Sequence, residues 1–157
     1  MNPKVIANFA AQFGVKIALN PELIIEKNGR LYEVNPNLRP FVRQSFFHAG
    51  VYLGKAKEGK FFPSFNLLAL LEREDANKVV VDAKAAWLYI CGRDILTKSI
   101  VRTCGSCRKN TNALVLNELG ECLGFGRIVE NLTDKAAVEQ IAVRNVLDLG
   151  DFLRRER

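Results

Sequence analysis

The sequence predicts an α+β protein: an N-terminal α/β domain over residues 1–77, then a small barrel of mostly antiparallel strands over residues 78–157. This expectation rests on a difference in residue pattern between the two halves of the sequence. Apolar residues recur at helical spacing in the first half, whereas short β-prone runs separated by turn residues fill the second half. The charged and polar segment Glu72–Lys78 separates these two patterns, so we expect the domain boundary there.

The first half is expected to open with a helix and a hairpin. Asn2 and Pro3 suit the cap and the first position of a helix that ends near Gly14. Asn28-Gly29 then lies between two β-prone runs. Because both of these residues tolerate positive φ, the pair is a strong signal for a β-hairpin.

Four further elements complete the first half. A second helix is expected over Leu38–Ala49, with Pro40 tolerated only because it falls in the first turn. Short strands are expected at Val51–Lys55 and Phe61–Phe62. A leucine-rich helix is expected from Phe65 onward, after Pro63 and Ser64.

The second half is expected to consist mainly of short strands. A turn at Gly92 should lead into a short helix, and the Gly- and Asn-containing segment Thr103–Asn112 should be a loop. Strands are expected at Val79–Val81, Ala86–Cys91, Ala113–Glu118, Cys122–Val129, Ile141–Arg144 and Phe152–Arg155. Many short strands at this spacing are typical of a small barrel.

The overall composition is that of an ordinary folded protein with a basic surface. The formal net charge of +6 raises the chance of a polyanionic partner, because cations that contact phosphates release bound counterions. No apolar run approaches the roughly 20 residues that a transmembrane helix needs. Because no secretory signal is visible either, we expect a cytoplasmic protein.

The segment Cys104-Gly105-Ser106-Cys107 is the most conspicuous local motif. A zinc site would need a second pair of ligands, but Cys91 and Cys122 are single and His48 lies in the other domain. A redox pair should open a helix, and the residues that follow are not typical of one. We therefore expect a loop, free or closed by a disulfide, with no metal and no cofactor.

Catalytic motifs are lacking. The chain has one histidine, His48, and no serine or cysteine in a recognisable nucleophile motif. The segment Gly50–Lys55 is one residue short of a phosphate-binding loop and has no Ser or Thr to hold magnesium. We therefore expect a binding protein rather than an enzyme.

Basic residues near two predicted elements suggest a phosphate-binding patch. In a terminal strand, Arg155 and Arg157 would project to one face and Arg154 to the other, and arginine can hold phosphate bidentately. Arg93, Lys98 and Arg102 flank the helix predicted after Gly92. If that helix packs near the last strand, the two groups form one patch, with the helix N-terminal amides as an additional anion site.

The second half resembles the PUA domain found in RNA-modifying enzymes and ribosome-assembly factors. The matching pieces occur in family order: Val79–Asp82, Ala85–Leu96, Gly120–Arg127 and Leu147–Arg155. The resemblance implies RNA contacts at the first helix and the last strand of that domain. The residues here at those positions are Gly92, Arg93, Lys98, Arg102, Arg154, Arg155 and Arg157.

The whole chain is similar to the Nip-seven family of ribosome biogenesis factors, which join a pre-PUA domain to a C-terminal PUA domain. The first half carries this resemblance through Gly50–Lys55, Lys60–Phe65 and the leucine-rich helix that follows. It implies a role in processing large-subunit ribosomal RNA, with assembly factors as protein partners and the RNA-degrading exosome among the candidates. We expect a monomer, and the short loops are typical of archaeal members.

Two other functions compete with RNA binding. The first is a protein–protein adaptor in ribosome assembly or exosome complexes, docking through Phe46, Phe47, Phe61 and Phe62 without touching RNA. We expect these phenylalanines to be core residues instead. The second is an RNA-modifying enzyme or a subunit of one, which would need a catalytic residue that the sequence does not reveal.

Overall fold

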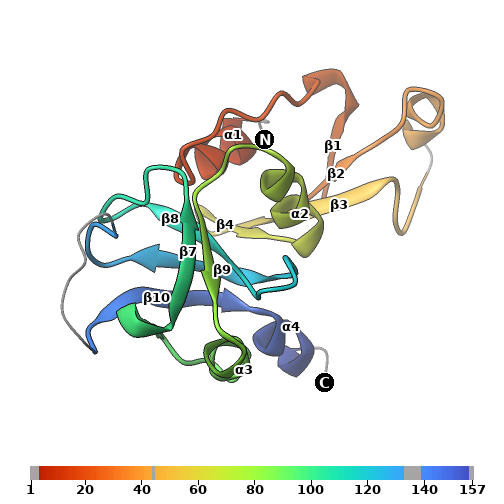
Figure 1. Ribbon diagram of the computed structural model, residues 1–157. Helices are drawn as coiled ribbons and strands as arrows, with labels where there is room; N and C mark the ends of the chain where they lie inside the picture. The colour runs from red at the N-terminus through yellow and green to blue at the C-terminus, as the bar shows by residue number, and fades with distance from the viewer. Residues whose placement is uncertain (1–3, 44, 133–138, 156–157) are drawn as a thin grey trace.

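The computed structural model describes residues 4–43, 45–132 and 139–155 of the chain (Figure 1). Four α-helices, ten strands and three 3₁₀ turns (η) lie in this part. In chain order they are α1 (Lys4–Ala11), η1 (Pro21–Leu23), β1 (Ile24–Lys27), β2 (Arg30–Glu33), η2 (Arg39–Arg43), β3 (Val51–Lys57), β4 (Lys60–Pro63), α2 (Phe65–Arg73), β5 (Lys78–Val81), α3 (Ala83–Ile90), β6 (Ile95–Leu96), η3 (Thr97–Ser99), β7 (Ile100–Cys104), β8 (Asn112–Leu116), β9 (Cys122–Ile128), β10 (Ile141–Asp148) and α4 (Leu149–Arg155).

The strands form two sheets, which confirms the predicted α+β class. The first half builds a four-stranded sheet in the order β1-β2-β3-β4. The second half builds a curled six-stranded sheet in the order β6-β10-β9-β8-β5-β7. All pairings are antiparallel except the one between β5 and β8. No helix in the described ranges is long and apolar enough to cross a bilayer.

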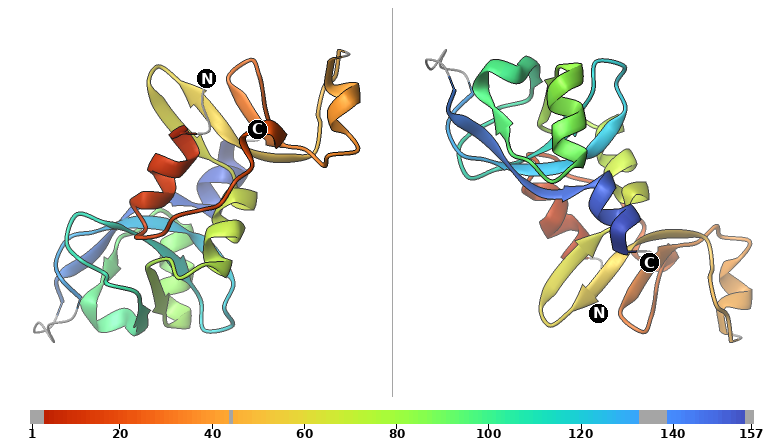
Figure 2. Two further views of the ribbon diagram at one scale, coloured as in Figure 1. Left: turned by 90° about the horizontal axis from the view of Figure 1, so that it is seen from above. Right: turned by 90° about the horizontal axis from the view of Figure 1, so that it is seen from below.

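Helices α1 and α2 lie between the two sheets, so both halves of the chain contribute to one core (Figures 1 and 2). Phe9 of α1 and Leu71 of α2 pack there with Leu53 of β3 and Phe125 of β9. These side chains are at most 7% exposed. The core fixes the first half against the second, and that placement creates the site described below.

Strand β8 separates this shared core from a second core inside the curled sheet. Leu114 and Leu116 face the shared core, whereas Ala113 and Val115 face the interior of the sheet. Successive side chains of a strand point to opposite faces, so a strand buried on both sides is apolar throughout.

Three predicted elements of the first half are confirmed. The hairpin β1–β2 turns at Asn28 and Gly29, with φ of 52° and 74°. The pair β3–β4 turns at Glu58 and Gly59 with φ of the same sign, again 52° and 74°. Helix α2 begins after Ser64, whose hydroxyl accepts a hydrogen bond from the Leu67 amide.

The helix predicted over Leu38–Ala49 is wrong. Only the 3₁₀ turn η2 forms there, and the chain then runs without regular structure toward β3. Pro40 lacks an amide hydrogen and disfavours the α conformation in the residue before it, which limits the helix at its start. Tertiary packing holds the segment between η2 and β3, because Phe46 packs against Tyr32 of the four-stranded sheet.

The strand predicted at Ala86–Cys91 is also wrong, since these residues belong to helix α3 and its C-cap. The Asp82 carboxylate caps the helix by accepting a hydrogen bond from the Ala85 amide at 2.8 Å. Ala85 and Tyr89 are both buried, and their spacing of four residues is that of a helix face. The Tyr89 hydroxyl donates to the carbonyl of Phe125 at 2.7 Å, which fixes α3 on the curled sheet.

Two further expectations about the second half are overturned. No α-helix follows Gly92, where the chain forms the short strand β6 and then η3. The predicted strand Phe152–Arg155 lies within helix α4, which Asp148 caps by accepting from the Asp151 amide at 2.7 Å. A Cβ on Gly150 would lie 1.9 Å from the Ile90 carbonyl oxygen. Only glycine therefore lets α4 approach the end of α3 this closely.

Candidate functional site

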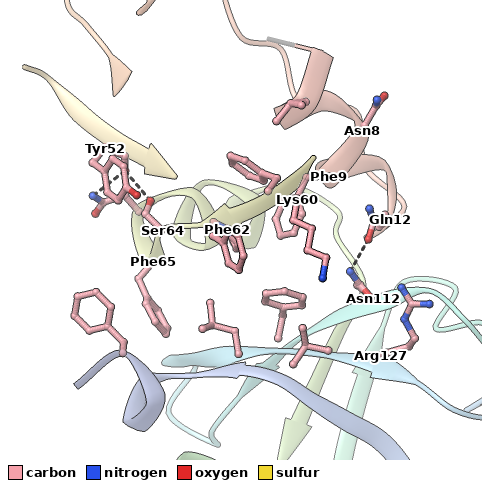
Figure 3. Close-up of a pocket in the computed structure, with 18 of the residues that line it drawn as sticks. Asn8, Phe9, Gln12, Tyr52, Lys60, Phe62, Ser64, Phe65, Asn112 and Arg127 are labelled. Carbon is pink, nitrogen blue, oxygen red and sulfur yellow. Dashed lines mark hydrogen bonds between the residues drawn. The ribbon is translucent and has the colours of Figure 1, made fainter. Parts of the chain in front are cut away.

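A groove of about 810 Å³ runs between the two halves of the molecule (Figure 3). Helix α1 and the segment from β4 to the start of α2 form one wall, and β8, β9, β10 and α4 contribute the other. Pockets of roughly 300–1,000 Å³ hold small ligands or parts of larger ones. The groove is therefore large enough to bind a group of nucleotide size.

Six phenylalanines are among the described residues that line the groove. The ring centroid of Phe9 lies 5.5 Å from that of Phe125, and the Phe65 centroid lies 5.8 Å from that of Phe152. Phe62 projects into the groove from β4 and is 43% exposed (Figure 3). Its ring is therefore available for contact with a flat ligand.

Two cations line the groove together with neutral polar groups. Lys60 extends into it from β4, toward the strands that carry Asn112 and Arg127 (Figure 3). Arg127 shares a face of β9 with Phe125, because the two residues are two positions apart. Arg127 also stands directly opposite Asn112 of β8. No carboxylate is among the described lining residues, so the groove favours an anionic ligand.

Hydrogen bonds fix both walls of the groove. The Asn112 side-chain amide donates to Gln12 Oε1 at 2.9 Å, and the Asn112 backbone amide donates to the Gln12 carbonyl at 2.8 Å. The Ser64 hydroxyl donates to the Tyr52 carbonyl at 2.6 Å. These contacts join α1 to β8 and the start of α2 to β3, so the groove is preformed.

Three of the residues predicted as RNA contacts lie together at the end where α3 meets α4. Gly92 and Arg93 form the turn after α3, and a Cβ on Gly92 would lie 4.0 Å from the Arg154 guanidinium. Arg154 donates to the Ile90 carbonyl and to the Asp148 carboxylate, each at 3.3 Å. Arg154 thus holds α4 on α3, while about half of its side chain stays exposed.

Lys98 and Arg102 lie elsewhere. Lys98 is in η3 and forms an ion pair with Glu139, just before β10, whereas Arg154 follows the other end of that strand (Figure 1). The eight extended residues of β10 span about 25 Å and separate Lys98 from Arg154. The two predicted groups therefore do not merge into one patch. Arg102 lies on β7, exposed.

The merged patch required a helix after Gly92 that packs near a C-terminal strand, and neither element forms as predicted. The helix whose amides were to form an anion site is absent, and the last strand is a helix. Arg155 lies in α4, but its side chain is not among those described, and Arg157 lies outside the described residues.

The cysteine loop holds free thiols in the structure, not a disulfide. Cys107 is buried, and its thiol donates to the Cys104 carbonyl at 3.2 Å, whereas Cys104 is exposed. Burial raises the pKa of the Cys107 thiol, which disfavours the reactive thiolate. Among the described residues no group of His, Cys, Asp and Glu could hold a metal ion.

Two of the four phenylalanines expected in the core are exposed. Phe61 packs against the shared core and Phe46 against the smaller cluster around Tyr32. Phe47 is 92% exposed and Phe62 is 43% exposed. Neighbours on a strand point to opposite faces, so Phe61 packs against the shared core while Phe62 is exposed, although both border the groove. The same parity, applied to Phe125 and Arg127, could have indicated from the sequence that these two residues share a face of their strand.

Comparisons with known proteins agree with this architecture. The chain is 26% identical to a UPF0113 protein of Archaeoglobus fulgidus over 160 residues, covering 98% of this chain and 91% of the relative. A conserved PUA domain protein from Thermoplasma acidophilum has a similar fold, with a TM-score of 0.62 at 20% identity over 98% of this chain and 92% of that one. A PUA domain from Aeropyrum pernix K1, solved as a tartrate complex, gives a TM-score of 0.62 at 18% identity over 98% and 86%.

The family comparison concerns the second half of the molecule. Residues 77–157, which carry the curled sheet and helices α3 and α4, match the UPF0113 PUA domain. The match covers more than half of the sequence, and the chain belongs to the UPF0113 PUA domain family.

Proposed function

We propose that this chain binds RNA and that an unpaired stretch of the RNA enters the groove between its two halves. The chain belongs to a PUA family, and PUA domains generally bind RNA. The observation that supports the groove as the site is its lining, in which phenylalanines and two cations occur without a described carboxylate.

The lining suits the chemistry of single-stranded RNA. Unpaired bases stack on aromatic rings, and Phe62 offers an exposed ring from the edge of β4. Lys60 and Arg127 can neutralise phosphates on either side of a bound base. At the α3–α4 end, Arg93 and the exposed part of Arg154 can contact the backbone of the same RNA.

The biological role follows from the resemblance to the Nip-seven family. We propose a non-catalytic factor in large-subunit ribosomal RNA processing, with assembly factors and the exosome as candidate partners. Turnover of a labelled RNA by the isolated protein would contradict the non-catalytic part of this proposal.

Fluorescence anisotropy with single-stranded and hairpin RNA over a series of salt concentrations tests the proposal. We expect tighter binding of the single strand, and the variant Lys60→Gln with Arg127→Gln should reduce the salt slope by roughly 1.4, since each phosphate contact contributes about 0.7. The matched control is Lys16→Gln with Lys84→Gln, which removes two exposed cations outside the groove. Absence of RNA binding by the wild type at low salt would refute the function.

A protein adaptor is the second candidate, and exposed apolar residues support it. Trp87 of α3 is 65% exposed and Leu153 of α4 is 62% exposed, on two helices that contact each other. Hydrogen exchange of α3 and α4, measured with and without a purified assembly factor, would test it. Protection of both helices by the factor, in a protein that binds no RNA, would favour the adaptor.

A further inference from the structure

Two hairpin turns of the first half repeat one pattern, in which a cation lies on each side of a two-residue turn. They are Lys27-Asn28-Gly29-Arg30 and Lys57-Glu58-Gly59-Lys60. The turns are neighbours at one end of the four-stranded sheet, because the Ala56 amide donates to the Gly29 carbonyl at 2.8 Å. With Lys55, five cations therefore gather at this end.

The strand register places these cations opposite one another. Arg30 faces Lys27 on one side and Lys55 on the other, and Lys57 faces Lys60. Residues directly opposite in a register share a face of the sheet, and like charges in such pairs destabilise it. Folding alone gives no reason for three such pairs in one sheet.

Carboxylates do little to offset this charge. Within the described residues, Lys57 pairs with Glu58 at 3.5 Å, and both side chains are largely exposed. Lys27, Arg30 and Lys55 make no ion pair with a described carboxylate. We call these five cations, with Phe47 beside them, the hairpin face.

Aromatic rings accompany the cations. The Lys27 ammonium lies 4.3 Å from the centroid of the Phe46 ring. Phe47 is 92% exposed and borders a hollow of about 290 Å³. The hollow is lined by Lys27, Asn28, Arg30, Tyr32, Phe46, Phe47 and Lys55, without a carboxylate.

The hairpin face is continuous with the groove. Lys55 of β3 stands directly opposite Phe62 of β4, which lines the groove. Lys60 belongs to both, because it faces Lys57 and also lines the groove. Since neighbouring strands lie about 4.8 Å apart, the row from Lys27 to Phe62 spans about 14 Å.

We infer that the hairpin face is a second contact surface for single-stranded RNA, which continues from the groove across β4 and β3 to Phe47. The inference rests on the proposed RNA binding. The cations contact successive phosphates and Phe47 stacks on a base, which is how sequence-tolerant single-strand sites are built. An acidic polypeptide would meet the charge, but it has no use for an exposed ring bordered by cations.

The test compares two lengths of unstructured oligocytidylate, about 2 and about 12 nucleotides, in fluorescence anisotropy. The variant Lys27→Gln, Arg30→Gln and Lys55→Gln should bind the longer RNA about tenfold more weakly, with a salt slope lower by roughly 2. Binding of the shorter RNA, which fits in the groove, should not change. Phe47→Leu should weaken the longer RNA by about fivefold or more without changing the slope.

The control variant Lys16→Gln, Lys84→Gln and Lys109→Gln removes three exposed cations outside both surfaces. If the wild type binds neither length, RNA binding itself is wrong. If the wild type binds both lengths and the hairpin-face variants behave like the control, the groove stands and the second surface is refuted. If the hairpin-face variants lose binding of polyglutamate but keep binding of RNA, the face belongs to an acidic protein partner, and the inference is also refuted.

Discussion

The α3–α4 end of the PUA half and the hairpin face of the N-terminal half both carry cations, but they use them differently. At the α3–α4 end Arg154 bridges the Asp148 carboxylate and the Ile90 carbonyl, and farther along β10 Lys98 pairs with Glu139. On the hairpin face Arg30 lies between two lysines and has no described carboxylate partner.

This difference shows that a basic residue in a sequence is not yet a free charge. Partners close in space but distant in sequence determine whether a cation stabilises the fold or stays available for an external anion. The cations singled out from sequence include two that are engaged within the fold. Arg30 and Lys55, which make no ion pair with a described carboxylate, lie in the half to which the sequence assigned no RNA contact.

The largest effect that sharpens the comparison is expected at the α3–α4 end. Asp148 is 3% exposed, caps α4 and pairs with Arg154. Asp148→Ala leaves a partly buried amide and a half-exposed guanidinium without their partner, so it should lower the free energy of unfolding by about 3 kcal/mol. Urea denaturation measures this change, with Asp75→Ala, at an exposed carboxylate after α2, as the comparison. A loss under about 1 kcal/mol would mean that the pair does not hold α4.

An intermediate effect is expected in the core that joins the two regions. Burial raises the pKa of the Cys122 thiol from 9.0 to about 11. Because the folded state holds this proton more tightly, the stabilisation is present below pH 9 and is lost as the pH rises toward 11. The loss should amount to about 2 kcal/mol and should be absent in Cys122→Ala.

Denaturant titrations of the wild type and Cys122→Ala between pH 8 and 11 measure this difference. Tyr89 also contributes at high pH, because burial and then Asp148 raise its pKa well above 10. It is present in both proteins, so the difference between them reports Cys122 together with its smaller charge coupling to Tyr89. Parallel curves for the two proteins would show that water reaches Cys122.

The smallest effect is expected on the hairpin face, and with the opposite sign. Lys55→Gln removes one like-charge pair with Arg30, so it should raise the free energy of unfolding by about 0.3 kcal/mol. The same change should weaken binding of RNA, which would show that the face trades stability for binding. A destabilised Lys55→Gln protein would indicate that the lysine has a role in the fold.

Local signals allowed much of the fold to be predicted from the sequence. The Asn28-Gly29 hairpin, the helix after Ser64 and most strands of the second half depend on turn and capping residues, which act on their near neighbours. The errors at Ala86–Cys91 and Phe152–Arg155 arose where β-prone residues lie in helices. Caps at Asp82 and Asp148 and the packing on the curled sheet determine those helices.

The candidate site was harder to predict. The groove needs both halves, since Lys60 and Arg127 are 67 positions apart in the sequence and meet only through the shared core. The hairpin face depends on strand register, which pairs Arg30 with Lys55 across 25 positions. Only its two turns, with their repeated pattern of flanking cations, were visible in the sequence.

The most direct test of the account is the salt slope of RNA binding when the free cations are removed together. The variant carrying Gln at Lys27, Arg30, Lys55, Lys60 and Arg127 should lower the slope for a long single strand by roughly 3.5. Arg93→Gln with Arg102→Gln, at the positions singled out from the PUA resemblance, should lower it by about 1.4 at most. An unchanged slope in the fivefold variant, together with loss of binding in the Arg93→Gln, Arg102→Gln variant, would contradict the account. That result would place the RNA site at the α3–α4 end and β7.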